Sequence, residues 1–294
     1  MNNQKILITG ASGFIGKNLK LGLEKKFNVL APDSKTLNLL DSYSVKKYLA
    51  KNNFHTVIHC ATHNATVTST KNLREVISSN LGMFVNLTRC QNSFERMFYF
   101  GSGAEYDMRH YIPKMKEEYF DSHVPVDDYG FSKYIMAKYV EKSNKIFDLR
   151  LFGCFGKYED YRIRFISNAI CKTVFNMDIT MYKNVYFDYL YIDDLIGIMK
   201  LFVQKNKLNF NYYNVCTGKS IDLFSIAKII KKTSGKNLKI KIAEKGYKKE
   251  YSGSNKRLIT EFGQIKFTPL EQSIRELLQW YEEDKKSLDK KQLI

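Results

Sequence analysis

Long apolar runs, acidic residues and proline are all scarce in this sequence of 294 residues. No run of about 18 apolar residues occurs, so no transmembrane helix is predicted. No signal-type apolar region precedes the first predicted strand, which favours a cytoplasmic protein. The cysteines are odd in number and several lie in apolar stretches, so we expect free thiols in a reducing compartment: Cys60, Cys90, Cys154, Cys171 and Cys216.

The shortage of acidic residues leaves a formal net charge of +17. Such a charge could attract nucleic acid, an acidic membrane surface or an anionic small substrate. The lysines, however, are scattered along predicted helix faces, and a dense cluster occurs only at Asp284–Lys291. With four prolines in a chain rich in Asn, Ile, Tyr and Phe, this pattern indicates a compositional bias towards lysine. We therefore expect no nucleic-acid partner and no membrane partner.

The first sixteen residues contain a glycine motif between a strand and a helix. Ile6–Ile8 is typical of a buried parallel strand, and amphipathic helical spacing follows from Phe14. Gly10, Gly13 and Gly16 would permit, in turn, a tight turn, close approach of a pyrophosphate to the backbone, and close packing of helix on strand. The helix start favours a diphosphate through its N–H groups and dipole. The position of the motif predicts dinucleotide binding rather than a plain surface turn.

Strand-like and helix-like segments alternate along the first half of the chain. This alternation predicts an α/β fold with a Rossmann-type, doubly wound parallel sheet. Beyond Gly156 the alternation loosens, and we expect a smaller, interleaved C-terminal substrate lobe. The predicted division assigns residues 1–152 plus 186–206 to dinucleotide binding and residues 153–185 plus 207–294 to the substrate lobe. Further predicted strands are 27–31, 56–60, 97–100, 146–152 and 210–216, and predicted helices are 42–51, 73–92, 128–143, 162–174, 193–204, 222–233 and 269–283.

Tyr129 and Lys133 lie four residues apart in the predicted helix after the fourth strand. This spacing places both side chains on one helical face. A neighbouring ammonium would lower the pKa of a phenol, ordinarily about 10, and so favour proton transfer near neutrality. Ser102 follows the fourth strand at the carboxyl edge of the sheet, where its hydroxyl could bind a substrate carbonyl. For each residue alone, a solvated helix face or a turn serine is the alternative.

Together these features resemble the extended short-chain dehydrogenase/reductase family, also called the NAD-dependent epimerase/dehydratase family. Most members of that family act on nucleotide-activated sugars. The similarity includes Leu37–Asp41, Val57–Ala61, Asn80 and Tyr189–Asp194. It extends from residue 4 to about residue 204 and is weaker beyond.

The resemblance implies roles at the matched positions. Ser102, Tyr129 and Lys133 would be catalytic, with Tyr129 as proton donor or acceptor. The implied partners are a nicotinamide cofactor, a nucleotide-diphosphate sugar and a second copy of the chain, bound through the helices at 73–92 and 128–143. The implied cofactor-binding residues are Gly10, Ser12, Gly13, Phe14, Ile15, Gly16, Asp33, Ser34, Lys35, Leu40, Asp41, Cys60, Ala61, Thr62, Asn80, Tyr129 and Lys133.

Within the family, Leu30–Asp41 and the Gly101-Ser102 pair are most similar to nucleotide-sugar 4-keto reductases such as GDP-fucose synthase and dTDP-4-dehydrorhamnose reductase. Ala104 stands where GDP-fucose synthase has an epimerising cysteine, so the resemblance implies simple reduction, in surface-polysaccharide sugar biosynthesis. Glu105 is expected to be a loop carboxylate facing solvent. Two alternatives stay open: a nucleotide-sugar epimerase with tightly bound NAD, and a non-catalytic dinucleotide-binding regulator.

The expected cofactor is NADP(H), with NAD(H) possible. Asp33 could hold the ribose 2′-hydroxyl of NAD, whereas Ser34 and Lys35 could receive a 2′-phosphate. Gly153 and Phe187 depart from the asparagine and arginine of many relatives, so phosphate binding is expected from other cations. The candidate substrate-binding residues are Ser102, Gly103, Arg162, Arg164 and Lys183.

The remaining segments give weaker signals. His55, His59 and His63 lack the spacing of metal ligands on a strand, so no metal is expected. Segment 105–125 has no periodicity and could be a lid. Segment 245–256 is expected to be an exposed basic loop that could close over a nucleotide, and the last ten residues a solvated tail.

Overall fold

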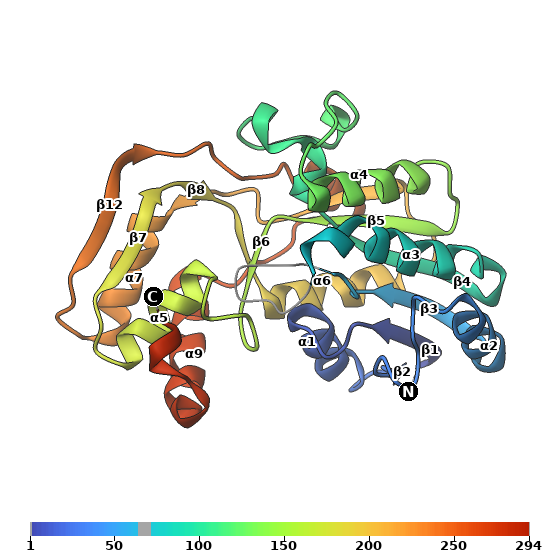
Figure 1. The fold of residues 1–294 in the computed structure, drawn as a ribbon, viewed down its shortest axis with the longest axis horizontal. Helices are drawn as coiled ribbons and strands as arrows, with labels where there is room; N and C mark the ends of the chain where they lie inside the picture. Colours follow the sequence, from blue (N-terminus) through green and yellow to red (C-terminus); the bar gives the residue numbers. More distant parts are fainter. Residues whose placement is uncertain (1, 64–71, 294) are drawn as a thin grey trace.

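The computed structural model describes residues 2–63 and 72–293 and places a parallel sheet, with helices on both faces, beside a smaller lobe (Figure 1). The six-stranded sheet has the order β10-β5-β4-β3-β1-β2, and each adjacent pair is parallel. The chain reverses its direction of travel between β1 and β3, which confirms the predicted doubly wound fold. The strands are β1 (Asn2–Thr9), β2 (Phe27–Leu30), β3 (Phe54–His59), β4 (Phe94–Ser102), β5 (Ile146–Leu151) and β10 (Tyr212–Val215).

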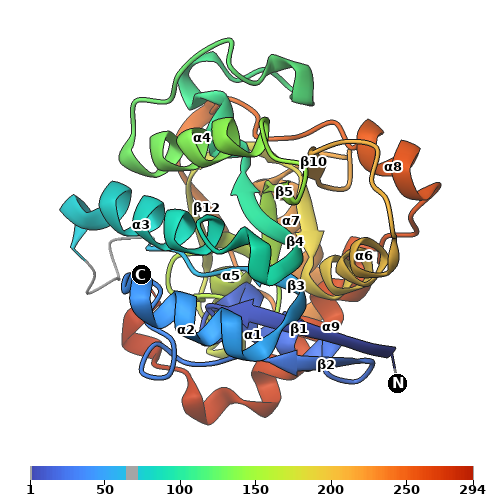
Figure 2. The same cartoon turned by 90° about the vertical axis from the view of Figure 1, so that its right-hand side faces the viewer.

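Helices α1 and α6 pack together on one face of the sheet, and α2, α3 and α4 pack in sequence on the other (Figure 2). Strand β1 explains this layering because successive side chains point to opposite faces. Ile6 and Ile8 pack in one buried cluster with Leu19 of α1, whereas Leu7 packs in another with Val45 of α2. These helices are α1 (Phe14–Leu23), α2 (Ser42–Asn52), α3 (Val76–Thr88), α4 (Asp128–Val140) and α6 (Ile192–Gln204).

The smaller lobe packs α5 against α7 and α9 and carries short strand pairs β7–β12, β6–β9 and β8–β11. Strand β10, from the range 207–294 expected to form this lobe, instead extends the large sheet, and α8 packs beside it. The elements are α5 (Phe165–Val174), α7 (Leu223–Ser234), α8 (Lys256–Phe262), α9 (Leu270–Glu283), β6 (Gly153–Phe155), β7 (Ile179–Asn184), β8 (Tyr186–Phe187), β9 (Tyr189–Tyr191), β11 (Ile221–Asp222) and β12 (Ile240–Tyr247).

Segment 105–125, suggested from the sequence as a possible lid, is packed against the protein rather than open. Tyr106, Tyr111, Met115 and Phe120 are buried in a cluster of their own. The Met115 N–H donates to Ser252 O at 3.0 Å, which ties the segment to a distant part of the chain. Apolar burial and this backbone bond therefore fix the segment beside α4.

The predicted helix 193–204 begins one residue earlier, as α6, with Tyr191 as its N-cap and Asp193 in its first turn. The predicted solvated tail is largely exposed from residue 285 to residue 292, and it is anchored where Leu293 is buried and where Asp289 N donates to Tyr161 Oη at 2.9 Å. Within the described ranges, the structure contains no helix of the length and apolarity that a membrane span needs.

Candidate active site

A cleft of about 1240 Å³ lies between the carboxyl edge of the sheet and the smaller lobe. Doubly wound sheets bind ligands at this edge, near the point where the strand order reverses. The predicted site residues that line the cleft are Gly10, Ser12, Gly13, Phe14, Ile15, Gly16, Asp33, Ser34, Leu40, Cys60, Ala61, Thr62, Ser102, Tyr129, Lys133 and Arg164.

The glycine turn between β1 and α1 has the geometry of an anion-binding turn. Gly10 has a φ of +70°, and a Cβ there would lie 2.6 Å from the Ala61 backbone. A Cβ on Gly16 would lie 2.3 Å from Gly10 O, whereas one on Gly13 would have an ordinary contact at 3.4 Å. No side chain caps α1, so its first-turn N–H groups can bind an anion in the cleft. These residues fit the pyrophosphate of a dinucleotide.

Ser102, Tyr129 and Lys133 meet at the inner end of the cleft. Ser102 ends β4, and its hydroxyl accepts from Ala104 N at 3.2 Å. Tyr129 and Lys133 lie in the first turns of α4, and both line the cleft with Ser102. Lys133 Nζ donates to Phe100 O at 2.7 Å and lies 5.6 Å from the Tyr129 ring centroid. The structure thus brings the three predicted side chains together.

The electrostatics of this cluster are dominated by burial. Burial raises the pKa of Tyr129, although the Ser102 hydrogen bond and the positive charge of Arg164 oppose the rise. The expectation of a lowered phenol pKa is therefore wrong for the chain by itself. Burial also lowers the pKa of Lys133 to about 8, against the attraction of nearby carboxyl groups, chiefly Glu105. Removal from water is thus the largest influence on the pKa of both groups.

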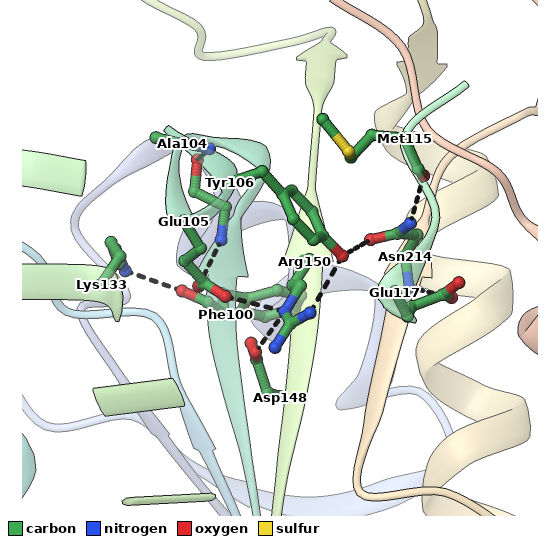
Figure 3. A network of polar contacts seen from close by, with 11 residues as sticks. Phe100, Ala104, Glu105, Tyr106, Met115, Glu117, Lys133, Asp148, Arg150 and Asn214 are labelled. Atoms are coloured by element: carbon green, nitrogen blue, oxygen red, sulfur yellow. Dashed lines mark hydrogen bonds and ion pairs between the residues drawn. The ribbon is translucent and has the colours of Figure 1, made fainter. Parts of the chain in front are cut away.

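Glu105 is fully buried, contrary to the expectation that it faces solvent, and its carboxyl group points at Arg150 (Figure 3). Its Oε1 accepts from Ser102 N at 2.9 Å, and its Oε2 lies 2.7 Å from Arg150 Nε. Asp148 Oδ2 also lies 2.7 Å from that nitrogen. Burial and the negative charge of Asp148 raise the pKa of Glu105 well above its ordinary value. Glu105 and Asp148 therefore share one guanidinium, that of Arg150.

The same network continues into β10 and segment 103–125 (Figure 3). Arg150 Nη1 donates to Tyr106 Oη at 2.9 Å, and that hydroxyl donates to Asn214 Oδ1 at 2.7 Å. Asn214 in turn donates to Glu117 Oε1 at 2.9 Å and to Met115 O at 2.8 Å. Buried polar groups that satisfy one another in this way hold the loop after Ser102 in one arrangement.

Several predicted cofactor residues lie outside the cleft lining. Asp41 is the N-cap of α2 and accepts from Tyr43 N at 3.0 Å. Asn80 acts behind the lining, because its Oδ1 accepts from His63 N at 2.7 Å and so fixes the turn after β3. Lys35 is exposed and is absent from the described residues that line the cleft.

Of the candidate phosphate-binding cations, Arg164 alone lines the described part of the cleft. Arg162 and Lys183 instead pair with neighbouring carboxylates, at 2.7 and 2.6 Å. Gly103 lies behind the lining, where a Cβ would meet Tyr251 Oη at 2.6 Å. The lobe side of the cleft is largely aromatic, with Phe152, Phe187, Tyr189 and Tyr251.

Tyr251 belongs to the cleft, although the sequence placed it in an exposed basic loop. It lines the cleft with Ser102, and burial raises the pKa of its phenol above the ordinary value although hydrogen bonding to Ser102 opposes the rise. The only sequence feature that pointed to Tyr251 was a tyrosine within a lysine-rich segment. That feature could not place Tyr251 in the site, because Ser102 lies far away in the sequence.

The histidines have structural partners. His59 Nδ1 lies 2.8 Å from Thr9 Oγ1, and burial, with the charge of Lys133, lowers its pKa to about 3. His63 Nε2 lies 2.9 Å from Asn72 O. Among the residues that the structure describes, no three His, Cys, Asp or Glu side chains gather as metal ligands.

The fold and the cleft define a dinucleotide-binding α/β enzyme with a Ser/Tyr/Lys site. The chain belongs to the NAD dependent epimerase/dehydratase family, whose model matches residues 6–216. Its expected membership of the extended short-chain dehydrogenase/reductases, which are NAD(P)-dependent enzymes, is thereby confirmed.

Individual relatives differ in activity. The chain is 28% identical over 269 residues to a dTDP-D-glucose 4,6-dehydratase of Dictyostelium discoideum, which covers 77% of this chain but only 61% of that protein. It is 23% identical over 299 residues to a UDP-glucose 4-epimerase of Pisum sativum, covering 82% and 84%. A GDP-L-fucose synthetase structure from Naegleria fowleri, bound to NADP, has a TM-score of 0.84 at 18% identity, covering 98% of this chain and 95% of that one. This last likeness shows the shared fold.

Proposed function

We propose that the chain is a cytoplasmic enzyme that reduces the 4-keto group of a nucleotide-diphosphate sugar with NADP(H), for surface-polysaccharide synthesis. The observation that supports this most is that Ser102, Tyr129 and Lys133 line one cleft together with the glycine turn. Ala104 carries no group able to take a proton from a sugar carbon, which favours reduction over ring epimerisation.

The side chains divide the work of reduction. When bound in the cleft, a reduced nicotinamide would supply a hydride to the carbonyl carbon. Tyr129 donates its proton to the carbonyl oxygen, while the Ser102 hydroxyl hydrogen-bonds that oxygen as negative charge develops. Its raised pKa keeps the Tyr129 phenol protonated before the reaction, as a proton donor requires. Lys133 would hold the nicotinamide ribose. Its ammonium also donates to Phe100 O and so connects α4 to β4.

The proposed preference for NADP(H) rests on the adenosine end of the cleft. Ser34 lines this end, and Asp33 Oδ1 already accepts from Thr36 N at 2.8 Å. Asp33 is therefore partly committed to its own loop rather than to a ribose hydroxyl. Michaelis constants for NADPH and NADH test the preference, and at least a tenfold preference for NADH would contradict it.

Arg164 is the proposed contact for the diphosphate of the sugar nucleotide. It stands at the start of α5 in the cleft lining, whereas Arg162 and Lys183 are engaged elsewhere. Mass spectrometry of products from a panel of 4-keto nucleotide sugars with NADPH would identify the substrate. A full panel without net NADPH oxidation would contradict the reductase proposal.

Replacing Tyr129 by phenylalanine should lower turnover at least a hundredfold, because the variant lacks the donated proton. Cofactor affinity, measured by NADPH fluorescence, should change little. Tyr134→Phe is the matched control, since Tyr134 lies on the same helix but bonds Asp121 outside the cleft. Near-normal turnover of Tyr129→Phe would remove Tyr129 as the acid.

A nucleotide-sugar epimerase is the second candidate, supported by the relative from Pisum sativum. An epimerase returns the hydride and so keeps its cofactor bound. Absorbance of NAD that copurifies with the chain, together with product formation without NADPH consumption, would favour this candidate.

We also propose a homodimer formed through α3 and α4. Val85 of α3 and Tyr139 of α4 are apolar side chains that are 38% and 43% exposed. Covering them in a partner interface would bury apolar surface.

A further inference from the structure

Tyr251 brings a second phenol to the catalytic serine from the opposite side of the cleft. Its side chain lines the cleft with Ser102, a Cβ built on the adjacent Gly103 would lie 2.6 Å from its hydroxyl, and hydrogen bonding to Ser102 lowers the pKa of Tyr251 against the rise that burial causes. Tyr129 lines the same cleft from α4. Ser102 therefore lies near a phenol of the sheet domain and a phenol of the smaller lobe.

The position of Tyr251 is fixed by ring and backbone contacts. Its N–H donates to Tyr186 O at 2.8 Å, and its carbonyl accepts from Asp188 N at 3.0 Å. The next residue, Ser252, bonds segment 103–125 through Met115 N. The Tyr251 ring centroid lies 5.1 Å from that of Tyr111, 5.2 Å from that of Phe152 and 5.5 Å from that of Phe187.

The hydrogen-bond capacity of Ser102 gives this contact a direction. A serine hydroxyl donates one hydrogen bond and accepts two. One acceptor position is taken by Ala104 N at 3.2 Å. Burial holds the pKa of Tyr251 above its ordinary value, so its phenol carries a proton to donate throughout the neutral range. When Tyr251 fills the second acceptor position, the serine proton is left to point at Tyr129 or at a substrate oxygen beside it.

We propose that Tyr251 is a positioning residue for the reaction: it donates to Ser102 Oγ and so directs the serine proton onto the substrate oxygen. This role of Tyr251 rests on the proposed function in one respect: the enzyme must transfer a hydride to or from a sugar carbon. Strand β8 and Asp188 hold Tyr251 in the cleft through backbone contacts, so the smaller lobe contributes the hydroxyl that acts on Ser102.

Tyr251→Phe tests the proposal because it removes the hydroxyl and keeps the packed ring. We expect kcat to fall about tenfold, the worth of one hydrogen bond, with KM and cofactor affinity within twofold. Tyr111→Phe is the matched control, since Tyr111 lies in the same aromatic cluster with its hydroxyl on Ser252 O at 3.4 Å, away from the cleft lining. Its kcat should be unchanged.

Because Tyr251 acts through Ser102, the two variants should not be additive. The Ser102→Ala/Tyr251→Phe double variant should turn over no more slowly than Ser102→Ala alone. A kcat of Tyr251→Phe within twofold of the native value, or a further tenfold loss in the double variant, would overturn the proposal. The assay can use any nucleotide sugar that the native chain converts, by reduction or by epimerisation.

A measurement without substrate separates this proposal from the proposed function. In Ser102→Cys, a donated hydrogen bond from Tyr251 would stabilise the thiolate and lower the pKa of the introduced thiol. Adding Tyr251→Phe should raise that pKa by about one unit, measured from the pH dependence of iodoacetamide alkylation by peptide mass spectrometry. An unchanged pKa would overturn the proposal, whereas absence of turnover on every sugar would contradict only the proposed function.

Discussion

Glu105 accepts a hydrogen bond from the backbone N–H of Ser102. Its partners Asp148 and Arg150 come from β5, and all three side chains are fully buried. Burial and the negative charge of Asp148 raise the pKa of Glu105 well above its ordinary value. The hydrogen bond that holds the loop after β4 needs an acceptor oxygen rather than a charge.

Glu105→Gln should accordingly keep kcat within about threefold of the native value, since an amide oxygen can still accept from Ser102 N. Glu105→Ala leaves Arg150 Nε and Ser102 N without this acceptor, and should cost about 3–5 kcal/mol of unfolding free energy and most of the activity. Urea unfolding and steady-state kinetics measure the two effects. Equal damage from both substitutions would mean that the site needs a charged carboxylate.

Glu159 makes stability depend on pH. Burial raises its pKa to about 8, although hydrogen bonding to Ser167 and the charge of Arg164 oppose the rise. The folded chain thus keeps a proton that the unfolded chain releases above about pH 4.5, so stability falls as pH rises from there to about 8. Between pH 5.5 and 8.5 the native chain should lose about 3 kcal/mol that Glu159→Gln does not lose. Urea unfolding at the two pH values checks this, and parallel losses in both chains would contradict it.

Among the elements, the close contact of β1 with α1 depends on Gly16. A Cβ there would lie 2.3 Å from Gly10 O, so Gly16→Ala should cost about 1–3 kcal/mol and weaken NADPH binding. Gly197→Ala in α6 is the control, because nothing lies within 4 Å of its added Cβ. It should stabilise the chain by about 0.5–1 kcal/mol through helix propensity. Thermal unfolding measures the stability of both variants, and equal stability of Gly16→Ala and Gly197→Ala would contradict the close contact between Gly16 and Gly10 O.

The elements that the sequence predicted are those with a buried pattern of their own. Strand β1 shows an apolar run because Leu7 and Ile8 face different buried clusters. Strand β12 was missed because its alternation of Ile240 and Ile242 with lysine is short and the strand is exposed beyond Ile240. Among the described residues it pairs with β7. Helix α8 was likewise not predicted from a seven-residue segment with few buried side chains.

The same distinction applies to the site. Tyr129 and Lys133 were found from helical spacing, and Ser102 from its place after a strand, because local pattern and sheet topology determine both. Glu105 and Tyr251 were misjudged because their partners lie far away in the sequence. Only the packed fold shows that one is buried and that the other reaches the serine.

At the scale of the whole molecule, the proposed dimer is testable by light scattering. We expect twice the chain mass of 34.4 kDa. Val85→Lys on α3 should shift the mass towards the monomer, because it places a charge in the proposed interface. Leu201→Lys on α6 is the control, since Leu201 is 39% exposed and Val85 38%. A native monomer, or equal effects of both substitutions, would contradict the proposed interface.

The interleaving of sheet and lobe bears on attempts to excise either part. After β5 the chain passes into the smaller lobe, returns as α6 and again as β10, and sends α8 back to pack beside β10. Phe202 of α6 packs on Phe98 of β4 with ring centroids 5.5 Å apart. A fragment ending at residue 152 would therefore lack one edge strand and expose an apolar sheet face to water. The cofactor-binding part therefore cannot be transferred to another protein as one continuous segment, because its strands and helices are spread over most of the chain.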